Sequence, residues 1–168
     1  MPKNSGGMSF TRQKYIHSIP QSKIRVFNMG DKKGEYSHVT LFKSAQTAKI
    51  SSETLEAVRV TANKVLENSG KPYLLRILIY PHEITREHKF MGFAGADRLS
   101  QGMSKSFGKS TGRAARISAG QDLIAIYTKS DAVDIARTAL KRASKKMPIS
   151  YTVVVEEIGA EETKDVEA

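Results

Sequence analysis

The sequence predicts an α+β fold in which a mostly antiparallel or mixed β-sheet is layered with two α-helices. Two segments carry apolar residues on one helical face, and roughly seven short segments are rich in β-branched and aromatic residues. The links between the expected strands are short and hairpin-like, which favours this class. The length of 168 residues suits one domain, and no internal repeat is present.

The first elements are predicted to be an arm and a hairpin. Residues 1–23 are basic and show no helical or strand period, so we expect an extended arm or a disordered tail. Residues 24–27 alternate as a half-buried strand, and residues 30–34 have the composition of a turn. A second strand over 38–43 would complete the hairpin.

The middle of the chain predicts a helix and a buried strand. Ser51 or Ser52 can cap a helix that ends at residues 68–70. A nearly continuous apolar run over 73–80 favours a buried strand that Pro81 ends, and a further strand is expected over 83–89. The apolar face of the helix consists of Leu55, Val58, Ala62, Val65 and Leu66.

The second half begins with a long glycine-rich loop, predicted over residues 91–112. Two strands over 115–119 and 123–128 follow it, and then a second helix capped by Ser130. A last strand covers 149–155. We therefore expect three regions: a basic arm (1–23), one α+β domain (24–158) that carries the extended loop, and an acidic tail (159–168).

Charge is the most informative part of the composition. The chain has 27 basic and 17 acidic residues, a net charge of +10, and six of the acids lie from residue 156 onward. A surplus of this size exceeds the roughly 2–8 charges that solubility alone requires. Such a field attracts polyanions, which are nucleic acids or anionic membranes.

Other classes of protein are disfavoured by the sequence. The absence of cysteine excludes disulfides and thiolate zinc sites, and indicates a reducing compartment. No run approaches the ~20 apolar residues of a membrane helix, and the first residues do not resemble a secretory signal, so we expect an intracellular protein without a membrane partner.

Residues 89–116 carry six basic residues against one acid, Asp97. Glycine lets a backbone approach a phosphate chain closely, and lysine and arginine bind phosphate oxygens or stack on bases. Phe90, Phe93 and Phe107 lie among these basic residues. We interpret them as residues that anchor the loop by packing rather than as stacking surfaces for bases. The loop is therefore the candidate nucleic-acid site.

No motif in the sequence predicts catalysis, a cofactor or a metal. Gly108-Lys109-Ser110 resembles the end of a phosphate-binding loop, but position 103, where that motif needs glycine, is Met103. The four histidines lack the spacing of a zinc site, and the carboxylates near the loop are scattered among basic residues. We therefore expect no catalytic residue and no small-molecule substrate.

Several ordered motifs resemble one ribosomal protein family. Residues 95–99, 102–103, 107–109, 112 and 115–116 are similar to the central loop of the archaeal and eukaryotic large-subunit protein L-ten-e, whose bacterial counterpart is L-sixteen. Residues 15–30 resemble the N-terminal segment of that family, and residues 55–64 its first helix. The chain departs from the family pattern at His17-Ser18, Ser104 and Ser110.

The resemblance implies a structural, non-enzymatic constituent of the large subunit in the cytoplasmic ribosome. Its partners would be large-subunit ribosomal RNA, transfer RNA near the peptidyl-transferase region, and neighbouring ribosomal proteins. Two alternatives remain open, an RNA-modifying enzyme and a sequence-neutral nucleic-acid-compacting protein. The RNA-binding residues expected from the arm and the loop are Arg12, Lys14, Lys23, Arg25, Lys89, Arg98, Lys105, Lys109, Arg113 and Arg116.

Overall fold

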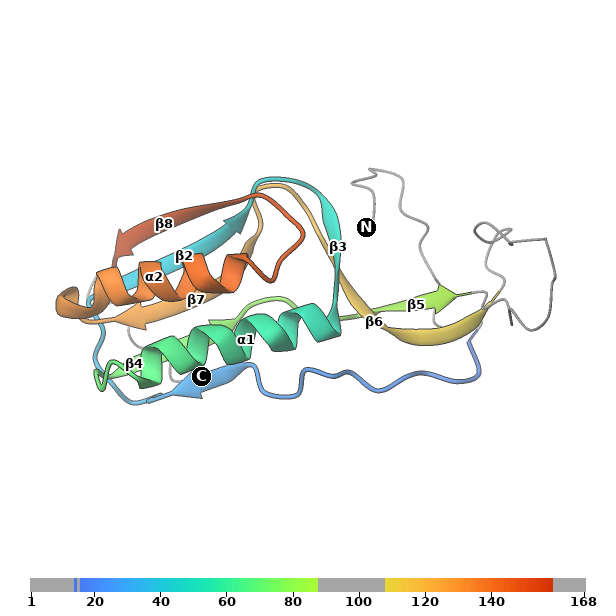
Figure 1. The fold of residues 1–168 in the computed structure, drawn as a ribbon, viewed down its shortest axis with the longest axis horizontal. Coiled ribbons are helices and arrows are strands. Elements are labelled where there is room, and N and C mark those ends of the chain that lie inside the picture. Colours follow the sequence, from blue (N-terminus) through green and yellow to red (C-terminus); the bar gives the residue numbers. More distant parts are fainter. Residues whose placement is uncertain (1–13, 15, 88–107, 159–168) are drawn as a thin grey trace, which may run out of the picture.

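A five-stranded antiparallel sheet forms the body of the protein (Figure 1). The computed structural model describes residue 14 and residues 16–87 and 108–158. The strands of this sheet follow the order β1-β4-β7-β2-β8. They are β1 (Asn28–Gly30), β4 (Tyr73–Ile77), β7 (Asp122–Thr128), β2 (His38–Ser44) and β8 (Tyr151–Glu157).

A second, three-stranded sheet extends from the body as a long ribbon (Figure 1). Its strands are β3 (Ala48–Ser51), β6 (Lys109–Ile117) and β5 (Glu83–Glu87), with β6 in the middle. β3 pairs with the last part of β6, whereas β5 pairs with its first part. The outer part of the ribbon is therefore formed mainly by β5 and β6, which lead into and out of residues 88–107.

Two helices lie side by side on one face of the five-stranded sheet (Figure 1). They are α1 (Ser52–Glu67) and α2 (Val133–Ser144). The Ser51 hydroxyl accepts a hydrogen bond from the Thr54 backbone N–H at 3.2 Å, which caps α1 as its sequence predicts. A serine cap of this kind contributes about 1 kcal/mol to stability.

The core lies between the helices and the sheet. The apolar stripe expected on the first helix is confirmed, because Leu55, Val58, Ala62 and Leu66 are almost completely buried. Phe42 of β2 is fully buried among them and stacks on Tyr151 of β8, with ring centroids 4.7 Å apart. The two helices and the antiparallel sheets confirm the predicted α+β class.

The prediction of a hairpin near the N-terminus is wrong. Residues 24–27 are not a strand, and β1 pairs with β4 and not with β2. Gly30 has a φ of 97°, and a Cβ atom at this position would lie 2.1 Å from the carbonyl oxygen of Tyr73. The alternation of residues 24–27 does not reflect a strand. Ile24 is buried in the core, although its segment does not pair with a strand.

Other elements also differ from the prediction, and the strand expected over 73–80 ends at Ile77. β6 begins at Lys109, so the last residues of the expected loop belong to a strand, and residues 91–107 lie outside the described residues. Ser130 starts a short 3-10 helix and does not cap α2, whose N-cap Ala132 makes no side-chain cap bond. The sequence did not predict β3, because four residues before the cap of α1 are too few to show the alternation of a strand.

Candidate nucleic-acid interface

An extended segment, residues 16–27, runs beside the ribbon before it enters β1 (Figure 1). The Ser110 hydroxyl donates a hydrogen bond to the Ser18 carbonyl at 2.7 Å, and Arg113 Nε donates one to the Pro20 carbonyl at 2.8 Å. Both donors belong to β6. The described part of the expected arm is therefore fastened to the ribbon along the edge that β5 does not cover.

Arg113 is the central residue of this attachment. Besides its bond to Pro20, its Nη1 donates a hydrogen bond to the Tyr80 hydroxyl at 3.2 Å. Tyr80 in turn contacts Phe27, with ring centroids 5.7 Å apart. The half-buried guanidinium thus joins the ribbon, the extended segment and the residues after β4.

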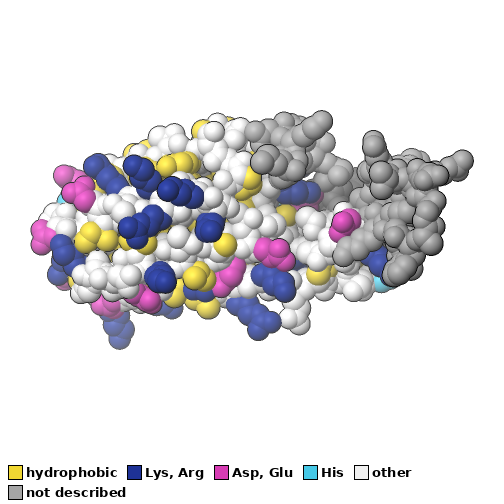
Figure 2. Space-filling model, viewed as in Figure 1, with side chains coloured by type: hydrophobic (Ala, Val, Ile, Leu, Met, Phe, Trp, Pro, Cys, Tyr) yellow, Lys and Arg dark blue, Asp and Glu magenta, His cyan; other side chains and the backbone are white. Residues whose placement is uncertain are grey.

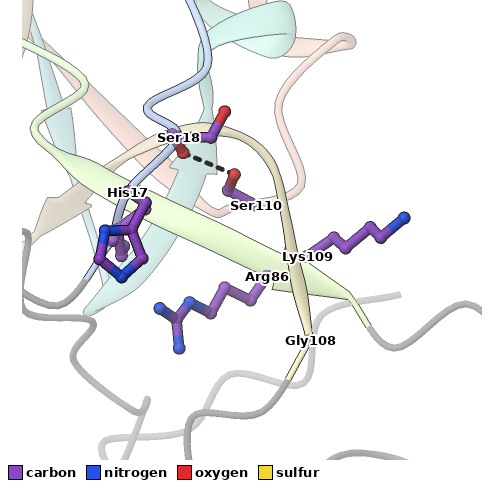
Figure 3. A pocket seen from close by; sticks show the side chains of 7 residues that line it. His17, Ser18, Arg86, Gly108, Lys109 and Ser110 are labelled. Atoms are coloured by element: carbon purple, nitrogen blue, oxygen red, sulfur yellow. Dashed lines mark hydrogen bonds between the residues drawn. The ribbon is translucent and has the colours of Figure 1, made fainter.

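The outer end of the ribbon forms a hollow of about 420 Å³ (Figure 3). Figure 3 shows the Arg86 and His17 side chains on one side of the ribbon and the Lys109 side chain extending away on the other. Cations therefore point to both sides of the β5–β6 end. The hollow is lined by Ile16, His17, Ser18, Arg86, Gly108, Lys109 and Ser110.

The strand register explains why Arg86 and Lys109 point to opposite sides of the ribbon. Arg86 pairs with Ser110, and the next residue, Glu87, pairs with Lys109, so the two cations lie on alternate faces. The register shift between Thr85 and Arg86 leaves Thr111 of β6 without a paired residue on β5, and a bulge of this kind re-aims the side chains of the bulged strand. Among the described residues, no carboxylate lines the hollow. Guanidinium, ammonium, imidazole and hydroxyl groups together are suited to binding anionic oxygens such as those of a phosphate.

A buried ion pair fixes the base of the ribbon. Lys49 of β3 and Glu83 of β5 lie on the two sides of β6, with Nζ and Oε1 2.7 Å apart, and the Glu83 side chain is only 1% exposed. Ala114 pairs with Glu83, and Arg116 pairs with Lys49, so all four residues share one face of this sheet. Because Ala114 is small, the pair can close across the central strand.

A second, smaller hollow of about 190 Å³ lies where α1 begins. Lys23 and Arg113 line it together with the polar groups at the helix start, but Glu53 lines it as well. Mixed charge makes this hollow a weaker anion site than the one at the ribbon end. Its other lining residues are Gln21, Ser51, Ser52, Thr85, Thr111 and Gly112.

The structure brings together only some of the predicted site residues. Lys109 lies at the ribbon hollow, and Lys23 and Arg113 line the smaller one. Arg25 is exposed, with its Nη2 donating to Gln21 Oε1 at 3.0 Å, and Arg116 is exposed on the other side of β6. Lys14 is exposed as well. Arg12, Lys89, Arg98 and Lys105 lie outside the described residues.

Sequence reasoning missed two residues of the ribbon hollow. Neither Arg86 nor His17 is among the residues that the sequence predicts for RNA binding. The signal for Arg86 is the strand pattern from residue 83, since the alternation of a strand places Arg86 on the face opposite to the buried Glu83. His17 could be found only once the arm was known to lie along β6.

Two departures from the family pattern meet at this place. The resemblance to the L-ten-e family implies proline at position 110, where this chain has Ser110, whose hydroxyl is the donor to Ser18. The bond uses the side chain of Ser110 but only the backbone of Ser18. A proline at position 110 would have no such donor, so this chain fastens its arm with a contact that the usual residue does not provide.

The described residues favour an anionic ligand at the ribbon end. Its hollow is lined by Arg86, His17 and Lys109 and, among the described residues, by no carboxylate. Across residues 16–87 and 108–158, no three potential metal ligands gather in one place. None of the helices in the same ranges is long and apolar enough to span a membrane.

Comparison with known proteins gives the family. Residues 6–154 match the family model for ribosomal protein L16p/L10e. The chain is 40% identical over 149 residues to large ribosomal subunit protein uL16 of Archaeoglobus fulgidus, covering 88% of this chain and 86% of the relative. It is 40% identical to the protein of the same name from Metallosphaera sedula, covering 96% and 95% of the two chains. The chain therefore belongs to the L16p/L10e family of ribosomal proteins.

Proposed function

We propose that this protein is a structural constituent of the large ribosomal subunit, where it binds ribosomal RNA through the outer end of its ribbon. Membership of a ribosomal protein family supports the assembly. The single observation that carries the RNA site is the hollow lined by Arg86, His17 and Lys109, in which the described residues place no carboxylate. The place of action is the cytoplasmic ribosome.

The ribbon end would bind RNA mainly through phosphate groups. Arg86 and Lys109 come from paired strands and point to different sides (Figure 3). An RNA strand, or two neighbouring strands, could therefore be held on both sides of the ribbon. Lys89, Arg98 and Lys105 would extend the same basic surface along residues 88–107, and Arg12, Lys14, Lys23, Arg25 and Arg116 would flank it.

Arg113 has a different role in this proposal. Its guanidinium already binds Pro20 and Tyr80, so it would position the arm against the ribbon before RNA arrives. Preorganisation of this kind reduces the conformational entropy lost on binding. Arg113 is therefore a positioning residue whose remaining N–H groups could still face RNA.

The finer part of the proposal concerns transfer RNA. The family resemblance implies that residues 91–107 extend toward the peptidyl-transferase region and help to position transfer RNA there. The catalytic groups of that region would belong to RNA, and this chain would act as a scaffold. Neighbouring ribosomal proteins would be its other partners.

Salt-dependent binding tests the RNA site. In Arg86→Ala/Lys109→Ala, the slope of log K against log salt for deproteinised large-subunit RNA should fall by about 1.4–1.8, since each lost phosphate contact removes about 0.7–0.9. Lys32→Ala/Lys33→Ala is the matched control, because both lysines are exposed at the other end of the molecule. Equal slopes for the two variants would refute the ribbon site.

The transfer RNA role needs its own experiment. Ribosomes carrying Arg98→Ala/Lys105→Ala should sediment normally but bind transfer RNA more weakly in filter binding. Unchanged binding would remove transfer RNA from the list of partners. Duplex DNA serves as a competitor in both assays, and a preference for it over structured RNA would favour the nucleic-acid-compacting alternative.

A further inference from the structure

The outer face of α2 carries cations that the ribbon site does not use. Residues 133–146 contain five bases and one acid, Asp134. All five bases are exposed, whereas the opposite face of the helix is buried in the core. The bases are Arg137, Lys141, Arg142, Lys145 and Lys146.

Helical geometry places three of these cations in one row. Arg137, Lys141 and Lys145 follow each other at intervals of four residues, which corresponds to about 6 Å along a helix axis. Like charges at this spacing destabilise an isolated helix. The row is therefore not explained by helix stability and is suited to a partner with regularly spaced negative charges.

Among the described residues, Asp134 is the one acid that pairs with a cation of this face. Asp134 lies 3.8 Å from Arg137, and both side chains are mostly exposed, so this pair is weak. Among the described residues, no carboxylate pairs with Lys141, Arg142, Lys145 or Lys146. The helix dipole favours bases in the last turn only, so it does not account for Arg137.

The neighbouring helix provides an internal comparison. α1 lies beside α2 on the same face of the sheet, but it carries three acids and two bases. Arg59 binds both carboxylate oxygens of Glu56, and this hydrogen bonding holds the pKa of Glu56 below its ordinary value. Mixed charge on both helices would be enough for solubility. The surplus of positive charge is found on α2 and not on α1, so solubility does not explain it.

The basic face lies on the body of the protein and not on the ribbon. Figure 1 shows α2 over the part of the five-stranded sheet that is remote from the β5–β6 end. In Figure 2, Lys and Arg side chains gather over this half of the same view. A partner that reaches both places must therefore be extended or must fold around the protein.

We propose that the outer face of α2 is a second RNA-binding surface, which contacts phosphates of a ribosomal RNA segment separate from the one at the ribbon. This inference rests on the proposed function. Charge complementarity selects a polyanion, and within a ribosome that polyanion is RNA. The face has no aromatic residue in α2 to stack on bases, so the contacts are to the backbone and independent of base sequence.

Binding of the full-length chain to deproteinised large-subunit RNA tests the second surface. Lys141→Ala/Arg142→Ala/Lys145→Ala should lower the salt slope by about 2–3, from 0.7–0.9 for each of three lost contacts. The control Lys32→Ala/Lys33→Ala/Lys64→Ala removes the same charge from exposed positions elsewhere and should lower it less. Melting temperatures measured beside the binding confirm that both variants are folded.

The outcomes separate this inference from the proposed function. If the wild-type chain binds the RNA but the α2 variant has the same slope as the control, only the second surface is refuted. If the wild-type chain does not bind, the RNA-binding function itself is refuted. A photo-crosslinker at position 142 in assembled subunits should form its adduct with RNA, and an adduct with a protein would overturn the choice of partner.

Discussion

Lys49 and Glu83 form the most buried ion pair among the described residues. The Lys49 side chain is 17% exposed and that of Glu83 only 1%, and the pair crosses β6 over Ala114. Removing one partner of a buried pair leaves an uncompensated charge, which costs more than the pair itself contributes. The ribbon depends on this pair because it ties β3 to β5.

Lys49→Ala should therefore lower the free energy of unfolding by about 3 kcal/mol, measured by urea denaturation. Lys43→Ala is the control, since Lys43 lies 3.5 Å from Asp122 in a pair that is about a third exposed. Its loss should cost no more than about 1 kcal/mol. Equal losses in the two variants would contradict the role of the buried pair.

Tyr36 is a buried phenol whose ionisation opposes folding. Its hydroxyl donates a hydrogen bond to the Asp31 carbonyl at 2.6 Å, and its side chain lies in contact with the ring of Tyr127. Burial and, second, the negative charge of Asp31 raise the pKa of Tyr36 to about 12. The fold thus favours the neutral form, so this stabilisation is complete below pH 10 and is lost as the pH rises toward 12.

Tyr36→Phe should flatten the fall in stability between pH 10 and 12, because phenylalanine has no proton to lose. Denaturation midpoints of both proteins across this range provide the measurement. At neutral pH the variant should lose about 1 kcal/mol with the missing hydrogen bond. If the stability of both proteins falls in parallel with rising pH, Tyr36 is not the group responsible. Burial also raises the pKa of Tyr73, and the ionisation of Tyr73 would then account for the whole loss of stability.

Single residues show how far the sequence could predict the site. Lys109 was predicted from charge alone, and it lies at the ribbon hollow. Arg86 was not predicted, because the face on which it lies depends on where β5 runs and on its pairing with β6. Arg113 was expected to face RNA, but its hydrogen bonds to Pro20 and Tyr80 depend on partners distant in the chain.

At the scale of elements, local pattern was sufficient for the helices and insufficient for strand partners. α1 was predicted from its apolar stripe and its serine cap, both of which are local signals. β1 has only three residues, and its pairing with β4 depends on a close approach at Gly30. β6 contains Gly112, which indicated a loop, although the residue pairs with Thr85 within the ribbon.

The arm and β6 form one structural unit that a single substitution should loosen. Arg113→Ala removes the bonds to Pro20 and Tyr80, and amide hydrogen exchange over residues 16–27 should rise while that of α1 stays unchanged. Stability should fall by roughly 1.5–3 kcal/mol, the range for hydrogen bonds to charged groups. Arg116→Ala is the control, because the exposed Arg116 lies on the other face of β6 from Arg113. Equal exchange in both variants would contradict the clamp.

At the scale of the whole molecule, positive charge is divided between two places. The ribbon end and the outer face of α2 are separated by the body of the protein (Figures 1 and 2). Six of the 17 acids follow in the last part of the sequence, from residue 156 onward. A scaffold that joins separate segments of RNA needs this division, whereas an enzyme needs one concave site with converging groups.

The central claim is that this chain is built into the large subunit through its basic surfaces. The most direct measurement is sedimentation of the tagged full-length chain from cells on a sucrose gradient, followed by immunodetection across the fractions. The account predicts that the protein migrates with large subunits and whole ribosomes, and that Arg86→Ala/Lys109→Ala moves part of it to the top of the gradient. Wild-type protein found only at the top, or with small subunits alone, would contradict the account.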